Sequence, residues 1–358
     1  MKFFVQHPYK ERIELNIGAI TQIVGQNNEL KYYTWQILNW YFGGKKYSSE
    51  DLSIFDYEEP TILDEVGEIV KRNSYHYIDI SSFKDLLEQM EYKKGTLAHA
   101  YLRKIANQVD IVTHLEKINE QVELIERAMN QHINLNCGQV EYHLENLPLT
   151  LDQLLTKNFS PFFAIENKNL SFEWVSNIDK LSLFLEMLDH LLSQTTEKYL
   201  IVLKNIDGFI SEESYTIFYR QICHLVKKYP NLTFILFPSD QGYLKIDEEN
   251  SRFVNILSDQ VEHLYDVEFM YERVMKYYPS NDFPTREGFR MSLETVTPYL
   301  LTKMLRQPSL SLVDSVILNI LNQLFHFSYR IRYSQTPDKE LLHKFLESKD
   351  WQGQLLIL

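Results

Sequence analysis

Apolar runs that alternate with amphipathic helices constrain the fold of this chain more than any other feature. Two runs, YLIVL at 199–203 and FILF at 234–237, are apolar at every position. The segment between them has apolar residues at helical spacing, with Ser211 as its N-cap and Pro230 at its end. Strands without polar alternation are buried on both faces, which is typical of a parallel sheet covered by helices. The sequence therefore predicts an α/β fold.

The first 80 residues carry further strand signals. KFFVQ and RIELNIG flank a turn at 7–9, which predicts a hairpin, and AITQIVG predicts a strand that ends in a glycine. Residues 30–42 have apolar side chains at helical spacing up to Gly43 and Gly44. SYHYIDI at 74–80 is another strand candidate. This strand–loop–helix order opens many α/β folds.

A long helical pattern separates the two halves of the predicted sheet. Apolar residues recur at steps of three and four from 97 to 129, with no Gly or Pro between them. The pattern predicts one helix of roughly 35 residues, about 50 Å long, because each residue adds 1.5 Å. Its charged flanks suit a projecting, coiled-coil-like element. SPFFAIEN is a short strand candidate, QVEHLYDVEF is a candidate third buried strand, and helical patterns dominate from Met270 onward.

The stretch IVGQNNELK at 23–31 has the outline of a phosphate-binding loop with parts missing. A working loop reads G-x-x-x-x-G-K-[ST], and its N–H groups, lysine and hydroxyl hold the phosphates and Mg²⁺. Gly25 and Lys31 have the required separation, but Leu30 replaces the second glycine and Tyr32 replaces the hydroxyl residue. A leucine side chain would obstruct the approach of backbone to phosphate. The phenol of Tyr32 is too long to replace a short hydroxyl ligand.

The apolar strand at 199–203 lacks the carboxylate that a P-loop enzyme needs. An aspartate follows the Walker-B strand and holds the metal, whereas Lys204 and Asn205 follow here, and Asp207 resembles a turn residue. We therefore predict a degenerate P-loop NTPase-like parallel sheet domain without nucleotide hydrolysis. Lys31 is then either solvated at a helix start or bound to a phosphate or a neighbouring carboxylate.

The predicted elements divide the chain into three parts. They are a discontinuous head domain at 1–81 and 158–269, an α-helical lid or leg domain at 82–157, and a helical C-terminal extension at 270–358. Cys137 and Cys223 give neither a disulfide framework nor a metal-type spacing. No stretch is apolar enough to span a bilayer, and the N-terminus lacks a signal-peptide pattern. We expect a cytoplasmic protein without a membrane partner or a bound metal.

Three features resemble the CRISPR-associated Csn-two family, accessory proteins of type II-A CRISPR systems that act when new spacers are acquired. KYLIVLKNIDGFISEESYTIFYRQI is similar to a strand–loop–helix of that family, and NLTFILFPSDQGYL is similar to its next strand and acidic turn. The degenerate loop followed by a long helical insertion fits the same layout. The resemblance covers roughly residues 1–265, is closest at 198–244, and indicates the long form of the family because of the extension at 270–358.

The resemblance implies a ring-shaped homotetramer that encircles double-stranded DNA, loads at ends, and has neither sequence specificity nor nuclease activity. It also implies a role in antiviral defence with the adaptation integrase pair and the RNA-guided nuclease. Short family members bind calcium through an acidic stretch after the long helix. NLNCGQVEYHLEN keeps Glu141 and Glu145 but has Asn136, Gly138 and Gln139 among them. Calcium needs several oxygen ligands, so we expect no required cofactor.

The net charge of −13 disfavours general nucleic-acid binding, because phosphates attract a positive surface. A ring can still line its hole with basic residues, which would read phosphates only and depend strongly on salt. The candidate lining residues are Lys45, Lys46, Lys93, Lys94, Arg103, Lys104 and Lys117. Each also suits an ordinary solvated face. Two other functions stay open: a P-loop ATPase with an atypical nucleotide site, and a coiled-coil scaffold that binds only protein.

Overall fold

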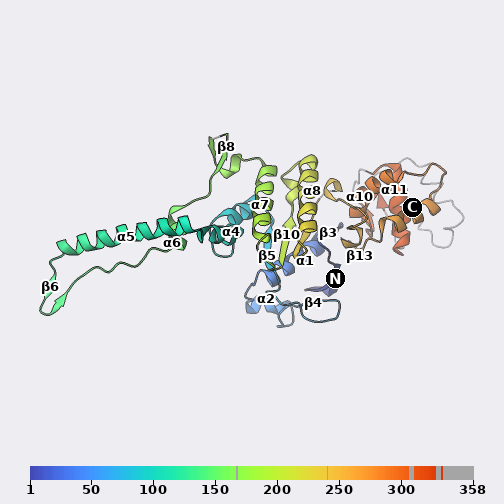
Figure 1. Ribbon diagram of the computed structural model, residues 1–358. Helices are drawn as coiled ribbons and strands as arrows, with labels where there is room; N and C mark the ends of the chain where they lie inside the picture. Colours follow the sequence, from blue (N-terminus) through green and yellow to red (C-terminus); the bar gives the residue numbers. More distant parts are fainter. Residues whose placement is uncertain (167, 240, 306–309, 328–331, 334–358) are drawn as a thin grey trace. The chain divides into compact units, whose positions relative to one another are not determined.

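A computed structural model describes the chain except for residues 167, 240, 306–309, 328–331 and 334–358 (Figure 1). The chain divides into two compact units, one formed by Phe83–Thr195 and the other by Met1–Ser82 with the described residues from Thr196 onward. None of the described helices has the length and apolar character needed to cross a membrane. This division places residues 158–195 with the inserted unit, and the three-part division from sequence stays a prediction.

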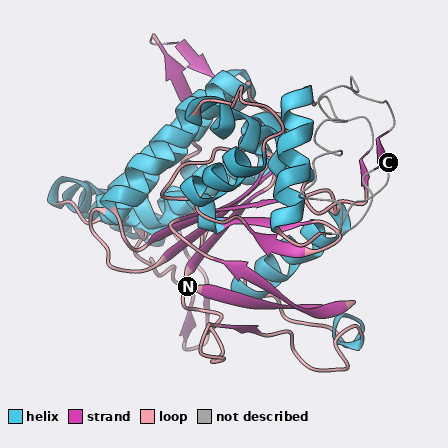
Figure 2. Cartoon of the chain, turned by 90° about the vertical axis from the view of Figure 1, so that its right-hand side faces the viewer, coloured by secondary structure: helices cyan, strands magenta, loops and turns pink. Residues whose placement is uncertain are grey.

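A six-stranded sheet in the order β13-β12-β3-β11-β10-β5 forms the centre of the first unit (Figure 2). Its strands are β3 (Ile20–Val24), β5 (His76–Ile80), β10 (Tyr199–Lys204), β11 (Leu232–Phe237), β12 (Val254–Leu257) and β13 (Val261–His263). The strands from β12 to β5 pair in parallel, and β13 joins the edge antiparallel. Every residue of β3 is buried. The predicted α/β fold with a parallel sheet is confirmed.

Two strand predictions have a different outcome in the structure. The third buried strand is β12, whereas QVEHLYDVEF supplies only the half-buried edge strand β13. The apolar run of β12 is only four residues long, too short to stand out in the sequence. SPFFAIEN does contain a strand, β8 (Phe163–Ile165), but β8 pairs with β9 (Lys168–Leu170) as a separate antiparallel hairpin of the second unit.

The predicted N-terminal hairpin is present and belongs to a second, antiparallel sheet. β1 (Lys2–His7), β2 (Lys10–Asn16) and β4 (Ile62–Leu63) form this sheet in the order β2-β1-β4. Alternate residues of β1 are buried, and they share one core with α1 (Asn28–Phe42) and with residues of β10 and β11. Arg72 closes the far end of α1, because its guanidinium donates to the carbonyls of Trp40 and Tyr41 at 3.1 and 3.0 Å. The short helix α2 (Ser49–Ser53) follows.

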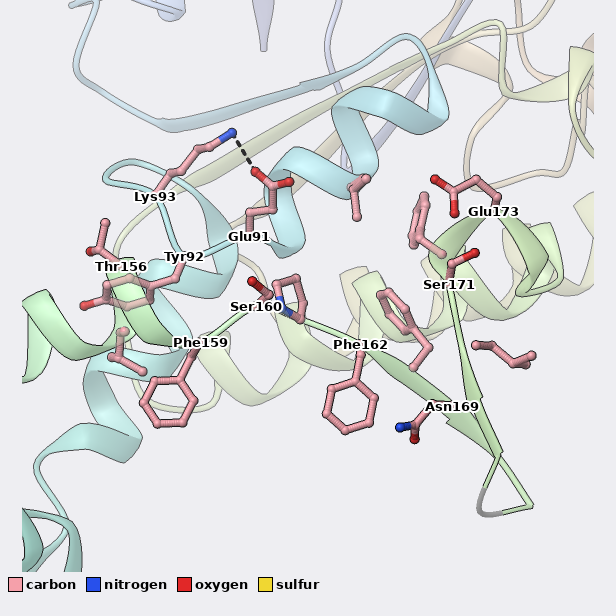
Figure 3. Close-up of a pocket in the computed structure, with 16 residues that line it drawn as sticks. Glu91, Tyr92, Lys93, Thr156, Phe159, Ser160, Phe162, Asn169, Ser171 and Glu173 are labelled. Carbon is pink, nitrogen blue, oxygen red and sulfur yellow. Dashed lines mark ion pairs between the residues drawn. The ribbon is translucent and has the colours of Figure 1, made fainter.

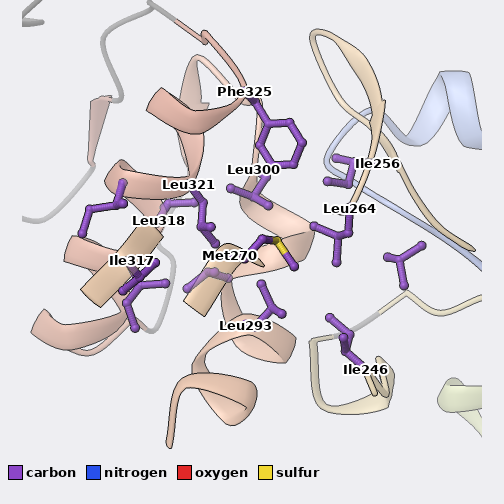
Figure 4. Close-up of a cluster of buried hydrophobic side chains, with 14 of the residues drawn as sticks. Ile246, Ile256, Leu264, Met270, Leu293, Leu300, Ile317, Leu318, Leu321 and Phe325 are labelled. Carbon is purple, nitrogen blue, oxygen red and sulfur yellow. The ribbon is translucent and has the colours of Figure 1, made fainter. Parts of the chain in front are cut away.

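A second core of the first unit is built mainly by residues after 240 (Figure 4). Its helices are α9 (Val267–Tyr277), α10 (Arg286–Val296) and α11 (Leu312–Leu324). α11 is the most apolar of these helices; it begins after a capping box at Ser311 and buries seven of its residues. β14 (Met304–Leu305) pairs with β15 (Arg332–Tyr333). The part of the predicted extension at 334–358 lies outside the described residues. α8 (Glu212–Lys228) follows the N-cap Ser211, as predicted.

The single long helix predicted at 97–129 is wrong. The second unit instead has α4 (Leu97–Ala106) and α5 (Val109–His132), separated by Asn107 and by Gln108 in an extended conformation. α4 packs with α3 (Phe83–Met90) and α7 (Asn177–Leu192), whereas α5 has no buried residue. The apolar period continues across the break, so the pattern could not reveal it. The packed part of this segment is therefore α4, and the packing ends at the break between α4 and α5.

The chain returns from the tip of α5 as an extended segment and reaches α6 (Leu151–Asn158). A short hairpin of β6 (Asn136–Cys137) and β7 (Val140–Glu141) forms the tip. Two asparagine side chains of α5 bind the backbone of the returning segment. We call residues 109–149 the arm (Figure 1).

Candidate functional site: the loop between β3 and α1

The loop between β3 and α1 is too short to surround a phosphate. α1 begins at Asn28, so Leu30 and Lys31 already lie in its first turn. Gly25 has a φ of 122°, and a Cβ there would lie 2.2 Å from the carbonyl oxygen of Leu257. The close approach of the segment after β12 therefore requires this glycine, independently of any phosphate.

Hydrogen bonds within the protein use the N–H groups of this loop. The N–H of Gln26 donates to Ser258 Oγ at 3.2 Å, and the N–H of Asn27 donates to the carbonyl of Leu257 at 3.2 Å. Asn27 Oδ1 caps α1 by accepting from the N–H of Leu30 at 2.9 Å. A phosphate would have to displace these partners, because a phosphate-binding loop uses the same kind of N–H groups.

Leu30 and Lys31 both turn toward the protein interior. Leu30 is 2% exposed and belongs to the core that α1 shares with the two sheets. Burial lowers the pKa of Lys31, and the nearby carboxylate of Asp207 opposes this shift. Asp207 is itself buried and accepts bonds from Ser239 N at 2.5 Å and Ser239 Oγ at 2.6 Å. Of the alternatives for Lys31, the structure favours a neighbouring carboxylate.

Lys204 lies among aromatic rings at the end of β10. Its ammonium is 3.7 Å from the ring centroid of Trp35 and 4.9 Å from that of Tyr32. Trp35 Nε1 donates to Asp79 Oδ1 on β5 at 2.7 Å. Burial lowers the pKa of Lys204, and Asp79 opposes the shift. We call these four residues, Tyr32, Trp35, Asp79 and Lys204, the Lys204 cluster.

The Lys204 cluster brings together the two positions at which a P-loop enzyme holds its metal. Tyr32 follows the loop lysine, where a hydroxyl ligand would be, and Lys204 follows the apolar strand, where a carboxylate would be. In this chain the ring and the ammonium contact each other by a cation–π interaction. Asn205 adopts a left-handed conformation with a φ of 57°, which asparagine tolerates. If the predicted P-loop correspondence holds, the ammonium of Lys204 takes the place of the carboxylate that would hold Mg²⁺.

The sequence pattern pointed to Lys204 and Tyr32 but not to Trp35 or Asp79, and Asp207 was interpreted only as a turn residue. Trp35 is one of several aromatic residues on α1, and the sequence does not say which of them faces β10. The register of β5 against β10 pairs Asp79 with Val202 and so brings its carboxylate close to Lys204. Asp207 had a usable signal, since an acidic residue just after a buried parallel strand lies at the edge where ligands usually bind.

The basic residues proposed to line a DNA channel are divided between the two units. In the first unit, Lys45 pairs with Asp51 at 2.8 Å and lies 3.4 Å from the ring centroid of Trp40, while Lys46 is exposed. These contacts restrain Lys45, so Lys46 is the freer of the two to approach a polyanion.

The other five candidates lie in the second unit. Lys93 pairs with Glu91 at 2.6 Å, and Lys104 Nζ donates to the carbonyl of Leu191 at 3.3 Å. The exposed candidates are Lys93, Lys94, Arg103 and Lys117. Lys104 thus helps to fix α4 to the end of α7, and the DNA-binding role of the seven residues stays a prediction.

The stretch that corresponds to a calcium site lies at the tip of the arm and beyond it. Glu141 is exposed and pairs with His143 at 3.1 Å, and Glu145 is exposed as well. Within the described part of the chain, no group of three or more His, Cys, Asp or Glu residues could hold a metal ion. The expectation about calcium stays a prediction.

A cleft of about 750 Å³ lies elsewhere in the second unit (Figure 3). Its walls come from α3, α6 and the β8–β9 hairpin, and the Glu91–Lys93 ion pair lies at its side. Phe159 and Phe162 contribute to its lining and are 62% and 68% exposed. This cleft was not predicted, because many of its lining residues lie in irregular segments without a period.

Comparison with known proteins identifies close relatives. A family model for CRISPR-associated protein Csn2, subfamily St, matches residues 5–347. The crystal structure of Stu0660 of Streptococcus thermophilus has 96% sequence identity and a TM-score of 0.90, and the match covers 97% of this chain and 100% of that one. A nucleotide-free ATP-binding cassette of an ABC transporter has 12% identity and a TM-score of 0.34 over 74% of this chain and 92% of that one, a likeness too low to argue from. No curated protein matches the chain.

Proposed function

Because the chain belongs to the Csn2 family of CRISPR-associated proteins, we propose that it is a non-enzymatic protein that binds the ends of double-stranded DNA during spacer acquisition. It acts as a ring-shaped homotetramer that encircles the duplex without reading its sequence. It works in the cytoplasm with the adaptation integrase pair and the RNA-guided nuclease of a type II-A system. The family resemblance expected from three sequence stretches is confirmed.

The Lys204 cluster is the observation that carries the non-enzymatic part of the proposal. Nucleotide hydrolysis on a P-loop needs a metal between a hydroxyl and a carboxylate. Here a tyrosine ring and an ammonium take those two positions and contact each other. The N–H groups of the short loop are bonded to Ser258 and Leu257 as well. The sheet therefore serves as a scaffold, and the alternative of an active ATPase loses support.

The exposed apolar residues of α5 support assembly of several copies. Ile118, Ile125 and Met129 are 41–59% exposed at steps of seven and four, and they share one face of the helix. Such a row is typical of a helix that packs against other helices. The homotetramer predicts a solution mass near 170 kDa, four times the 42.7 kDa of one chain.

Phosphate contacts from exposed basic side chains are the physical basis of the proposed DNA binding. A protein with a net charge of −13 binds duplex only where such side chains cluster. The binding is then independent of sequence and weakens steeply with salt, because each contact releases counterions. Among the described residues, the exposed candidates outside any ion pair are Lys46, Lys94, Arg103 and Lys117.

A gel shift with the full chain tests the proposal. Linear duplex should bind at low salt and lose affinity as salt rises, whereas a covalently closed circle of the same sequence should bind less. The variant Lys94→Glu/Arg103→Glu/Lys117→Glu should lose binding, and Lys10→Glu, at an exposed position of β2, is the matched control. Unchanged binding by the triple variant would show that another surface contacts DNA.

The exposed row on α5 also favours a second function, a scaffold that binds only protein. The same gel shift distinguishes the two, because a scaffold binds neither DNA at any salt concentration. An active ATPase would show stabilisation by Mg-ATP in a thermal melt, and Lys31→Ala would remove that stabilisation. The proposal predicts no stabilisation in either protein.

A further inference from the structure

α4 is fixed within the second unit, whereas α5 beyond the break is not packed. Leu97 and Ala98 of α4 are 2% and 1% exposed. Lys104 donates to the carbonyl of Leu191, and the ring of Tyr101 lies 6.0 Å from that of His190. α5 has 24 residues and none of them is buried. Packing therefore sets the direction of α4 and contributes little to the direction of α5.

The break between the two helices is weakly stabilised. Gln108 has a φ of −69° and a ψ of 141°, and its side chain makes no capping bond to α5. A helix without a side-chain cap is less stable at its first turn. Residues 105–112 contain no Gly or Pro and keep the apolar period, so a continuous helix is also open to this sequence. Rotation mainly about one backbone bond, ψ of Gln108, interconverts the bent and the continuous form.

The arm beyond the break is held together internally. Asn119 of α5 donates to the carbonyl of Leu149 at 3.1 Å and accepts from its N–H at 2.7 Å. Asn130 makes the same pair of bonds with Leu144, at 2.9 and 2.8 Å. These residues are eleven apart, about three turns, and so lie on one face of α5. The helix and the returning segment therefore move together.

A side-chain hydrogen bond joins the segment that follows the arm to the packed part of the second unit. Thr150 caps α6 directly after the arm, and Asp152 in the first turn of α6 accepts a bond from the hydroxyl of Tyr92. Tyr92 precedes α4 in the connection from α3. Burial and this bond raise the pKa of Tyr92 to about 12, so the hydroxyl keeps its proton at neutral pH. The arm thus joins the packed part of the second unit at two places. One is the break at Asn107 and Gln108, and the other is the Tyr92–Asp152 hydrogen bond next to its second end.

We propose that residues 109–149 swing as one rigid arm about a hinge at Asn107 and Gln108, with the Tyr92–Asp152 hydrogen bond as the latch that restrains the swing. The inference does not rest on DNA binding, since it concerns the free protein. It gives the chain an element whose direction a bound ligand or a second copy can set.

Electron spin resonance distances between two labels test the hinge. Cys137 at the tip of the arm is exposed and takes one label. Glu186→Cys on an exposed position of α7 takes the other, in a Cys223→Ser background diluted with unlabelled chain. Tyr92→Phe should broaden the distance distribution and add a second maximum. Asn107→Ala/Gln108→Ala favours the continuous helix and should shift the distribution to one different, narrower maximum.

Tyr142→Phe is the matched control, because Tyr142 is 55% exposed on the arm and lies away from the latch. It should leave the distribution as in the parent. Circular dichroism of every variant establishes that the helices are retained. Distances that stay unchanged in both Tyr92→Phe and Asn107→Ala/Gln108→Ala would overturn the hinge.

Discussion

Lys204 carries a positive charge that is partly buried at the end of β10. Its ammonium is attracted by the face of Trp35 at 3.7 Å and by Asp79, and both attractions offset the cost of partial burial. A lone lysine at the same place would be less favourable, which explains why the cation occurs together with aromatic residues on α1.

A double-mutant cycle measures this dependence. Lys204→Met and Trp35→Leu should show a coupling of about 0.5–2 kcal/mol in the free energy of unfolding, because a cation–π contact contributes about that much. Urea unfolding of the four proteins gives the value. The cycle of Lys204→Met with Tyr33→Leu is the control, since the ring of Tyr33 packs on His7 and Tyr9. Equal coupling in both cycles would contradict a specific Lys204–Trp35 contact.

Lys31 should make the stability of the protein depend on pH. Burial lowers its pKa in the folded state below the model-peptide value of 10.5. Between these two values the unfolded state binds more protons, so the free energy of unfolding of the wild type rises with pH in that window. The stability of Lys31→Met relative to the wild type should therefore fall as pH increases toward 10.5.

Chemical denaturation at several pH values up to 10.5 tests this effect. Lys46→Met, a substitution of an exposed lysine, provides the baseline for the comparison. A free energy of unfolding of Lys31→Met that instead rises relative to that of the wild type as pH increases would mean that Asp207, and not burial, dominates the environment of Lys31.

Sequence reasoning identified residues whose position along the chain is diagnostic and missed those that depend on three-dimensional register. Gly25, Leu30, Lys31 and Lys204 follow from spacing after an apolar strand. Asp79 reaches the cluster only because β5 lies beside β10, and strand order is not written in the sequence.

At the scale of elements, the arm should lose its internal order when its asparagines are removed. Asn119→Ala/Asn130→Ala removes four hydrogen bonds to the returning segment. Hydrogen exchange at the amides of Leu144 and Leu149 should become at least about tenfold faster, since two bonds protect them and about 1.4 kcal/mol corresponds to a factor of ten.

Gln131→Ala, at an exposed position of α5 close to Asn130, is the control and should leave this exchange unchanged. Unchanged exchange in the asparagine variant would show that apolar contacts, and not these bonds, hold the segment.

The strands and most helix ends were predictable because local signals determine them. Apolar runs mark β3, β10 and β11, and Ser211 marks the start of α8. The break at Gln108 was not predictable, because the apolar period is the same in a bent and in a continuous helix. The break separates α4, which packs on α3 and α7, from α5, which has no buried residue, and such tertiary packing is not visible in the apolar pattern.

At the scale of the whole molecule, the chain combines a sheet unit with a second unit that carries an exposed apolar arm. Neither unit alone explains how an acidic chain would hold DNA. The proposed ring would explain how an acidic chain holds DNA, because a closed ring retains a duplex by topology and needs few phosphate contacts.

Retention on DNA with blocked ends is the most direct test of this central claim. The protein is loaded on linear duplex, both ends are blocked with streptavidin, and the complex is washed at high salt, which removes purely electrostatic binding. The account predicts that protein stays on the blocked DNA and leaves DNA whose ends are open. Loss from both at the same rate would contradict encirclement.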